Sequence, residues 1–294
     1  MMPVDMSEKK KVTGIAQAIL AHLAFGWIVI FGKMAYREGI GTIELVSYRF
    51  GLSALVLWIY SLMFAKKSFV FRPSHLPVIL AMGVLGYATV SLSYFYALNF
   101  ISASLTTLIL YVKPSITTLL ARLFFGEPLT PRKILALFVT FSGACLIIGF
   151  EIGVVDSRGI FFALFAVFVS ALYSTVGQSV LKTTPPKTVS LYVITAAGLF
   201  FSFFHNPLAA FHGSCSLEGL LLVLLLVFVS TIPPIFLFLA AIEKIGSARA
   251  AMLNCAEPLM AVVAAYIILG ERLTPVQIVG GGAIIAGAFL VSRI

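Results

Sequence analysis

The stretch GEPLTP at residues 126–131 recurs as GERLTP at residues 270–275, and this repetition decides the fold. The copies stand 144 residues apart (126 to 270), and identities continue at that spacing on both sides without a gap. So many coincidences at one spacing indicate an internal repeat. The further matched pairs are Ala97 and Ala241, Ile101 and Ile245, Pro114 and Pro258, Ala121 and Ala265, Ile134 and Ile278, Gly143 and Gly287, Ala144 and Ala288, and Leu146 and Leu290.

The composition around the repeat is that of a membrane protein. Of the 294 residues, 61% are hydrophobic and 11% are charged, whereas soluble domains contain roughly 45–50% apolar and about 25% charged residues. These values exclude a disordered chain and argue against a soluble protein. A helix needs about 20 apolar residues to cross a bilayer, and long continuous runs do not fit the short alternating strands of a membrane β-barrel. Ten runs suit such helices, at residues 12–35, 42–65, 75–97, 102–124, 131–150, 159–181, 188–207, 217–241, 247–269 and 275–293.

Lysine and arginine are unevenly distributed between the loops of the two sides. If the N-terminus is cytoplasmic, the outer segments hold only Arg37, Arg158 and Arg272, and the other loop cations face inward. Because cytoplasmic loops carry the excess of Lys and Arg, both termini are predicted to be cytoplasmic. The net charge of +9 is scattered over short loops, so no nucleic-acid partner is expected. The three cysteines have no metal-ligand spacing and cannot form a fully paired disulfide framework.

The repeat divides the chain into two units of five spans each. We expect a cytoplasmic tail at residues 1–11, a first repeat at 12–150 and a second repeat at 151–294. An odd number of spans inverts the second copy relative to the first. The expected fold class is therefore an all-α integral membrane protein with ten transmembrane helices in two inverted five-helix repeats. This is the architecture of secondary transporters, whose sites lie near the midplane and open to each side in turn.

With these motifs the chain resembles a known family. Pro114, the GEPLTP stretch and Gly143, repeated as Pro258, the GERLTP stretch and Gly287, are similar to the EamA repeat of the drug/metabolite transporter superfamily. The resemblance covers essentially the whole chain. It implies a central cavity lined by spans 1, 3, 4, 6, 8 and 9, with spans 5 and 10 as scaffold. It leaves the substrate open, because the family moves amino acids, purines, S-adenosylmethionine, sugar derivatives and organic cations, and many relatives are proton-coupled exporters or exchangers.

Two ionisable residues lie deep in the expected spans, where a charge is costly and needs a functional or pairing reason. Lys113 and Glu257 each precede a repeat-matched proline, Pro114 or Pro258, so they occupy equivalent positions in the two halves. Three interpretations stay open. Lys113 binds a substrate carboxylate while Glu257 binds its amine, Glu257 is a proton site coupled to substrate release, or the two residues form a structural ion pair. Both prolines are expected to bend their helices.

Further polar residues mark the expected cavity helices. His22 lies near the middle of the first span, and its side chain suits either hydrogen-bonded packing or a proton relay. Arg49 in the second span is expected to be structural and to extend outward. Pro233 and Pro234 interrupt the eighth span, and interrupted helices often line transport sites. The remaining candidates for substrate contact are Tyr94 (on one face with Tyr87 and Ser91), Tyr111, Tyr173, Gln178 and Asn254.

These features predict a secondary active transporter, an exporter or exchanger of a small metabolite. The favoured substrate is an amino acid or another zwitterion such as S-adenosylmethionine, and the alternative is proton-coupled export of organic cations or drugs. No G-x-x-x-x-G-K-[ST] phosphate loop occurs, so gradients would drive transport. The sequence has neither the charge rings of a channel nor the clustered reactive groups of an intramembrane enzyme.

The expected partners are the substrate, the lipid bilayer and protons as the coupling ion, with no cofactor and no metal. A bacterial inner-membrane location is expected. Small residues over 280–288 are expected to pack the tenth span against the fifth within one chain, which favours a monomer over a homodimer.

Overall fold

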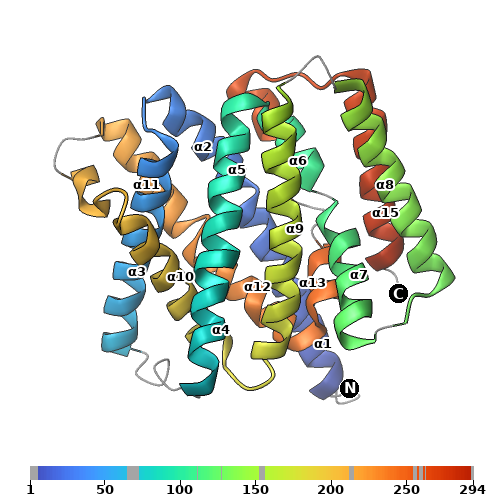
Figure 1. The fold of residues 1–294 in the computed structure, drawn as a ribbon, viewed down its shortest axis with the longest axis horizontal. Coiled ribbons are helices and arrows are strands. Elements are labelled where there is room, and N and C mark those ends of the chain that lie inside the picture. The colour runs from blue at the N-terminus through green and yellow to red at the C-terminus, as the bar shows by residue number, and fades with distance from the viewer. Residues whose placement is uncertain are drawn as a thin grey trace, which may run out of the picture.

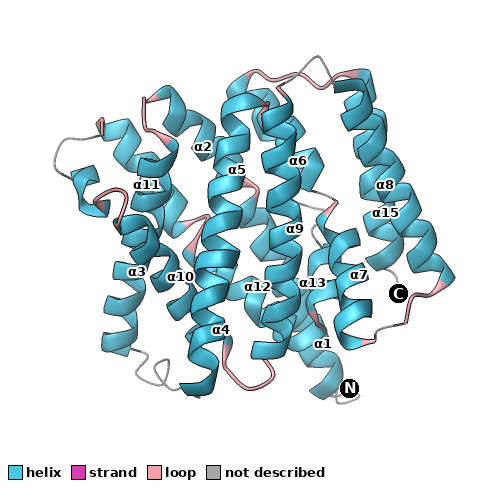
Figure 2. Ribbon diagram, in the orientation of Figure 1, coloured by secondary structure: helices cyan, strands magenta, loops and turns pink. Residues whose placement is uncertain are grey.

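The computed structural model describes residues 6–64, 73–110, 112–126, 128–151, 156–211, 215–253, 257, 261 and 263–292. Every regular element within these ranges is helical, and none is a strand (Figure 2). This agrees with the all-α fold class predicted from the continuous apolar runs. A helix pairs its backbone polar groups within the segment, as a lipid environment requires.

The helices follow the predicted spans closely. The first half of the chain forms α1 (Met6–Phe25), α2 (Trp27–Arg37), α3 (Thr42–Phe64), η2 (Pro73–His75), α4 (Leu76–Ala81), the π-helical turn η3 (Met82–Ala88), α5 (Thr89–Phe100), α6 (Ala103–Leu110), α7 (Lys113–Phe125) and α8 (Pro131–Glu151). The second half forms α9 (Ser157–Val180), α10 (Pro186–Ser202), η4 (Pro207–Phe211), α11 (Leu217–Phe228), α12 (Ile232–Ile245), α13 (Ser247–Met252), η6 (Ala265–Leu269) and α15 (Pro275–Ser292).

Six helical stretches of the described chain are long and apolar enough to cross a membrane. They are Lys9–Arg37, Thr42–Phe64, Leu76–Phe100, Ala103–Phe125, Ser157–Val180 and Leu217–Ile245. The other four expected spans correspond to α8, to α10, to α13 together with η6, and to α15, which are helical where they are described.

Each copy of the repeated motif ends one helix and begins the next. Gly126 and Gly270 adopt φ values of 68° and 72°, a left-handed conformation that glycine tolerates best. Thr130 and Thr274 then accept hydrogen bonds from the amides three residues further on, at 3.3 and 3.2 Å. A proline follows in the first turn of α8 and of α15, where no helical hydrogen bond is lost.

The loop before α8 and the loop before α15 lie at opposite ends of the molecule, as an inverted second repeat requires (Figure 1). The two helices themselves run side by side at one edge of the bundle, which confirms the expected packing of the fifth and tenth spans within one chain. α15 also approaches α6 closely at a glycine. A Cβ atom added at Gly281 of α15 would lie 2.8 Å from Cδ2 of Leu108 on α6.

Within the described residues, two spans are interrupted along their length. A turn at Gly26 separates α1 from α2, and residues 229–231 separate α11 from α12. The second of these is the eighth span, in which the sequence places Pro233 and Pro234. In the fourth span α6 ends at Leu110 and α7 begins at Lys113. At a break in a helix, some backbone N–H and C=O groups have no partner within the helix. They can form hydrogen bonds with side chains or a ligand between the helices.

The described prolines of these spans lie at helix starts. Pro114 lies in the first turn of α7, and Pro233 and Pro234 lie in the first turn of α12, where the fixed φ of proline suits a helix. The expectation that Pro114 bends its helix stays a prediction, because residue 111, between α6 and α7, lies outside the described residues. The matched residue Pro258 lies outside the described residues.

Candidate functional site

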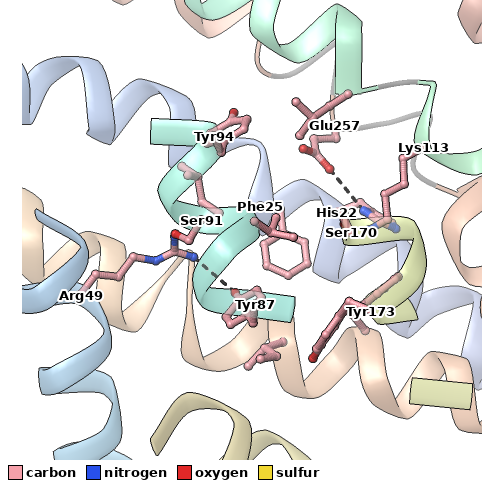
Figure 3. Close-up of a pocket in the computed structure, with 15 residues that line it drawn as sticks. His22, Phe25, Arg49, Tyr87, Ser91, Tyr94, Lys113, Ser170, Tyr173 and Glu257 are labelled. Carbon is pink, nitrogen blue, oxygen red and sulfur yellow. Dashed lines mark hydrogen bonds and ion pairs between the residues drawn. The ribbon is translucent and has the colours of Figure 1, made fainter. Parts of the chain in front are cut away.

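A cavity of about 100 Å³ lies where the interrupted helices meet (Figure 3). Both halves of the chain contribute to its wall, and no described residue of α8 or α15 does, in keeping with the scaffold role that the resemblance implied. The α3 helix, from the second span, contributes as well, which the resemblance did not imply. The lining residues are His22, Phe25, Ile28, Arg49, Tyr87, Val90, Ser91, Tyr94, Leu110, Lys113, Ser170, Tyr173, Ile235, Phe238 and Glu257.

Glu257 and His22 form the acidic side of the cavity. Glu257 is 8% exposed, and its Oε2 lies 3.3 Å from Nδ1 of His22. Nε2 of His22 lies 3.1 Å from the carbonyl oxygen of Ala250. Because that carbonyl can only accept, Nε2 carries a hydrogen. A hydrogen bond at the Nδ1–Oε2 contact then requires one more proton, on the ring or on the carboxyl group. The geometry therefore allows a proton to be held between the two side chains.

Lys113 lies at the start of α7 and faces the same cavity. Its Nζ lies 4.8 Å from the centre of the Phe238 ring, a distance at which the ring face attracts a cation. Among the described residues, no ion pair joins Lys113 to Glu257, whose carboxylate contacts His22 instead. The interpretation of Lys113 and Glu257 as a closed structural pair is therefore not supported in this conformation, although both side chains line the cavity.

Arg49 enters the cavity from a different side (Figure 3) and is 2% exposed. Its Nε donates to Oγ1 of Thr231 at 2.6 Å, and its two terminal nitrogens donate to Oγ of Ser91 at 2.8 Å and to the hydroxyl of Tyr87 at 3.3 Å. A longer contact of 3.4 Å reaches the carbonyl oxygen of Ser230. The expectation that Arg49 extends outward is therefore wrong, because the break between α11 and α12 supplies acceptors inside the bundle.

All four acceptors around Arg49 are neutral, and within the described part of the chain no carboxylate lies in ion-pair distance of it. A buried guanidinium that lacks a counter-ion destabilises the folded state. An anionic ligand would supply the missing charge. The signal for this residue was present in the sequence, since an ionisable residue within a span is a functional candidate by default. The sequence did not show, however, in which direction the side chain points.

Aromatic rings cover much of the remaining wall. Tyr94 is buried in the cavity wall on one helix face with Tyr87 and Ser91, as the spacing predicted. The rings of Tyr87 and Tyr173 stack with their centres 5.7 Å apart. The Tyr173 hydroxyl is buried and has no hydrogen-bond partner within the described residues. It is therefore available to a polar group of a bound ligand.

Gln178 does not line the cavity, in contrast to the prediction. Its Oε1 accepts a hydrogen bond of 2.6 Å from the amide of Ser247 and so caps the start of α13. The side chain is already used in joining α9 to α13. Two other candidates, Tyr111 and Asn254, lie outside the described residues.

Comparison with known proteins places the chain among transporters. The sequence pattern of the EamA-like transporter family matches residues 12–149 and again residues 157–293. An uncharacterized transporter of Archaeoglobus fulgidus is 23% identical over 280 residues, which are 94% of this chain and 98% of that protein. The threonine/homoserine exporter RhtA of Escherichia coli K12 is 32% identical over 143 residues, which are 48% of this chain and 47% of RhtA.

A solved crystal structure shares the fold, with a TM-score of 0.71 at 16% identity over 97% of each chain. The family pattern covers both halves of the sequence, in agreement with the internal repeat. The long apolar helices fit an integral, multi-pass membrane protein. On this evidence the chain belongs to the EamA-like transporter family, within the drug/metabolite transporter superfamily.

Proposed function

We propose that the protein is a secondary active exporter or exchanger of a small zwitterion, an amino acid or a related compound such as S-adenosylmethionine. One observation carries the proposal. A single cavity holds two cations without a carboxylate partner among the described residues, Arg49 and Lys113, and one carboxylate, Glu257, in contact with His22. Buried charges of both signs in one small cavity complement a ligand that carries both signs.

The substrate carboxylate would bind toward the cations and the ammonium group toward Glu257. Lys113 stands at the N-terminus of α7, so the positive end of the helix dipole adds to its charge. Arg49 presents the planar donor group that suits a carboxylate. RhtA, to which about half of the chain is similar, is an exporter of threonine and homoserine, and this supports both the amino-acid class and the outward direction.

The proton shared by His22 and Glu257 provides a means of coupling. An arriving ammonium group would compete for the carboxylate and release the proton, and a returning proton would expel the substrate. Binding of substrate and of proton to Glu257 would then be mutually exclusive. Substrate would therefore be exchanged for a proton as the cavity opens to each side of the membrane in turn.

Export of organic cations is the second candidate, and the aromatic wall favours it. Phe25, Tyr94 and Phe238 line the cavity beside Glu257, and aromatic rings with one carboxylate suit a cation. Arg49 and Lys113 would repel a ligand without a negative group. The zwitterion therefore remains the better match.

For the membrane arrangement we propose ten spans, with both termini in the cytoplasm and repeats at residues 12–150 and 151–294. The excess of loop Lys and Arg on one side supports this orientation. The opposite positions of the two motif loops support the inversion (Figure 1). Packing of α8 on α15 inside one chain supports a monomer, and we assign the protein to the bacterial inner membrane.

Counterflow into proteoliposomes tests the proposal, with labelled amino acids, S-adenosylmethionine and organic cations at two pH gradients. We expect saturable exchange of a zwitterion that is lost in both Lys113→Ala and Glu257→Ala. Lys182→Ala is the matched control, because Lys182 is exposed and does not line the cavity. Exchange of cations alone, lost in Glu257→Ala but kept in Lys113→Ala, would replace the zwitterion with the organic-cation alternative.

A further inference from the structure

A second cavity, of about 370 Å³, lies between α3, α10 and the junction of α11 with α12. It is separate from the substrate cavity and shares none of its lining residues. Its walls are mainly apolar and include Leu57, Ile232 and Phe236. Two further lining residues, Tyr60 and Phe228, are 48% and 52% exposed, so the cavity reaches the surface of the helix bundle that faces the bilayer.

Two polar groups interrupt these apolar walls. Lys187, in the first turn of α10, is exposed, and its Nζ lies 6.0 Å from the centre of the Phe236 ring. Within the described residues no carboxylate forms an ion pair with it. One turn further along α10, Ser190 is 3% exposed, and its hydroxyl has no hydrogen-bond partner within the described chain. A buried hydroxyl without a partner is uncommon in a native protein.

We propose that this cavity binds an anionic phospholipid. The phosphate would pair with Lys187 at the mouth, a headgroup or ester oxygen would accept the hydrogen bond of Ser190, and an acyl chain would cover Leu57 and Phe236. A free phosphate would satisfy the two polar groups and leave the apolar walls uncovered. A neutral or zwitterionic lipid would cover the walls and leave the lysine without a net negative partner.

The position of the cavity agrees with this choice of ligand. The last turns of α3 and the first turns of α10 contribute to its lining, and these helix ends lie at the same end of the molecule as the start of α1 (Figure 1). The first turns of α1 contain Lys9, Lys10 and Lys11. Loops rich in lysine face the cytoplasm, and anionic lipids enrich the cytoplasmic leaflet. The bound lipid would thus come from the leaflet that contains the most negative headgroups.

A lipid at this site would also contact α12, on a different face from the one that lines the substrate cavity. Ile232 and Phe236 of α12 line the lipid cavity, whereas Ile235 and Phe238 of the same helix line the substrate cavity. The first turns of α12 are therefore the wall between the two sites. An occupied lipid site would brace these turns just after the break at residues 229–231, and transport would depend on anionic lipid.

The test is native mass spectrometry of the full-length protein in detergent, titrated with phosphatidylglycerol, phosphatidylcholine or inorganic phosphate. One surface cation contributes enough to lipid binding for its loss to weaken affinity about fivefold. We expect phosphatidylglycerol to bind more tightly than phosphatidylcholine, and Lys187→Ala to weaken it about fivefold. Lys182→Ala is the matched control, an exposed lysine over the ring of Phe125 outside the cavity, and should bind as the wild type does.

A second variant fills the cavity without changing charge. Leu57→Trp should reduce binding of both lipids, with the melting temperature in detergent reporting that the fold persists. Equal affinity for the two lipids, equal loss in the two lysine variants, or displacement of the lipid by inorganic phosphate would each overturn the proposal. These readouts need no substrate, so they stand apart from the assignment of the transported compound.

Discussion

Replacing Glu257 by glutamine should abolish zwitterion exchange and its pH dependence while leaving the fold intact. Oε2 of Glu257 lies 3.3 Å from Nδ1 of His22. The other ring nitrogen faces the carbonyl oxygen of Ala250 at 3.1 Å, so the contact with Glu257 depends on a shared proton. A glutamine amide carries its own hydrogen and can donate it to Nδ1. The contact then survives without a titrating group.

The size of the effect follows from what the variant loses. Removing one partner of a buried, hydrogen-bonded charge pair costs about 2–5 kcal/mol, which corresponds to binding weakened by roughly 30- to 5000-fold. Stability should change by about 1 kcal/mol at most, because one hydrogen bond replaces another. Transport and folding should therefore separate clearly in Glu257→Gln.

Counterflow in proteoliposomes at two pH values, with thermal melting of the same preparations, measures both properties. Glu218→Gln is the matched control, because Glu218 is an exposed carboxylate at the start of α11. The control should transport and melt as the wild type does. If Glu257→Gln exchanged substrate at the wild-type rate, or kept a pH dependence at a reduced rate, the shared-proton assignment would be refuted.

Three further predictions concern the fold, each read from thermal melting. Gly198→Ala should lower the melting temperature, because the added Cβ would lie 2.9 Å from a backbone oxygen of α3 and overpacking costs about 1–3 kcal/mol. The control Gly282→Ala should not lower it, because a Cβ there would have no atom within 4 Å. Equal drops in melting temperature for the two variants would refute the argument. Glu271→Ala should destabilise the fold by about 0.5–2 kcal/mol. The carboxylate of Glu271 accepts two amide hydrogen bonds and one hydroxyl hydrogen bond at the start of α6. An unchanged melting temperature would mean that this cap is dispensable. Hydrogen bonds from Arg158 lower the pKa of Asp156, so this carboxylate stabilises the fold above its unfolded pKa, and the contribution is lost as the pH falls through the lower folded pKa. Asp156→Asn should flatten the acid limb of the melting curve against pH, and an unaltered limb would contradict this assignment.

The helical segments and the equivalent positions of the two repeats could be predicted from the sequence, whereas the rotation of each helix about its axis could not. Apolar runs fix where a span begins and ends, and the repeat spacing placed Lys113 and Glu257 at equivalent positions, which line one cavity. The direction of the Arg49 side chain was predicted wrongly because α3 is apolar on most of its surface. No apolar stripe along the helix therefore shows which face turns inward. The Arg49 acceptor Thr231 lies 182 residues further along the chain. The same reason applies to Gln178, whose partner on α13 is also remote in sequence.

The repeats use equivalent positions for opposite chemistry, and this bears on how a substrate could drive transport. Both cavity cations, Arg49 and Lys113, come from the first repeat, whereas the carboxylate Glu257 comes from the second. At the repeat spacing Arg49 corresponds to Val193 and Lys113 to Glu257, so neither cation has a duplicate in the second half. A zwitterion bound as we propose would be held by its carboxylate to one repeat and by its ammonium group to the other. A ligand with only one of these charges would hold one repeat alone. Since alternating access is a rocking of one repeat against the other, only the ligand that bridges both would stabilise the closed intermediate through which exchange must pass.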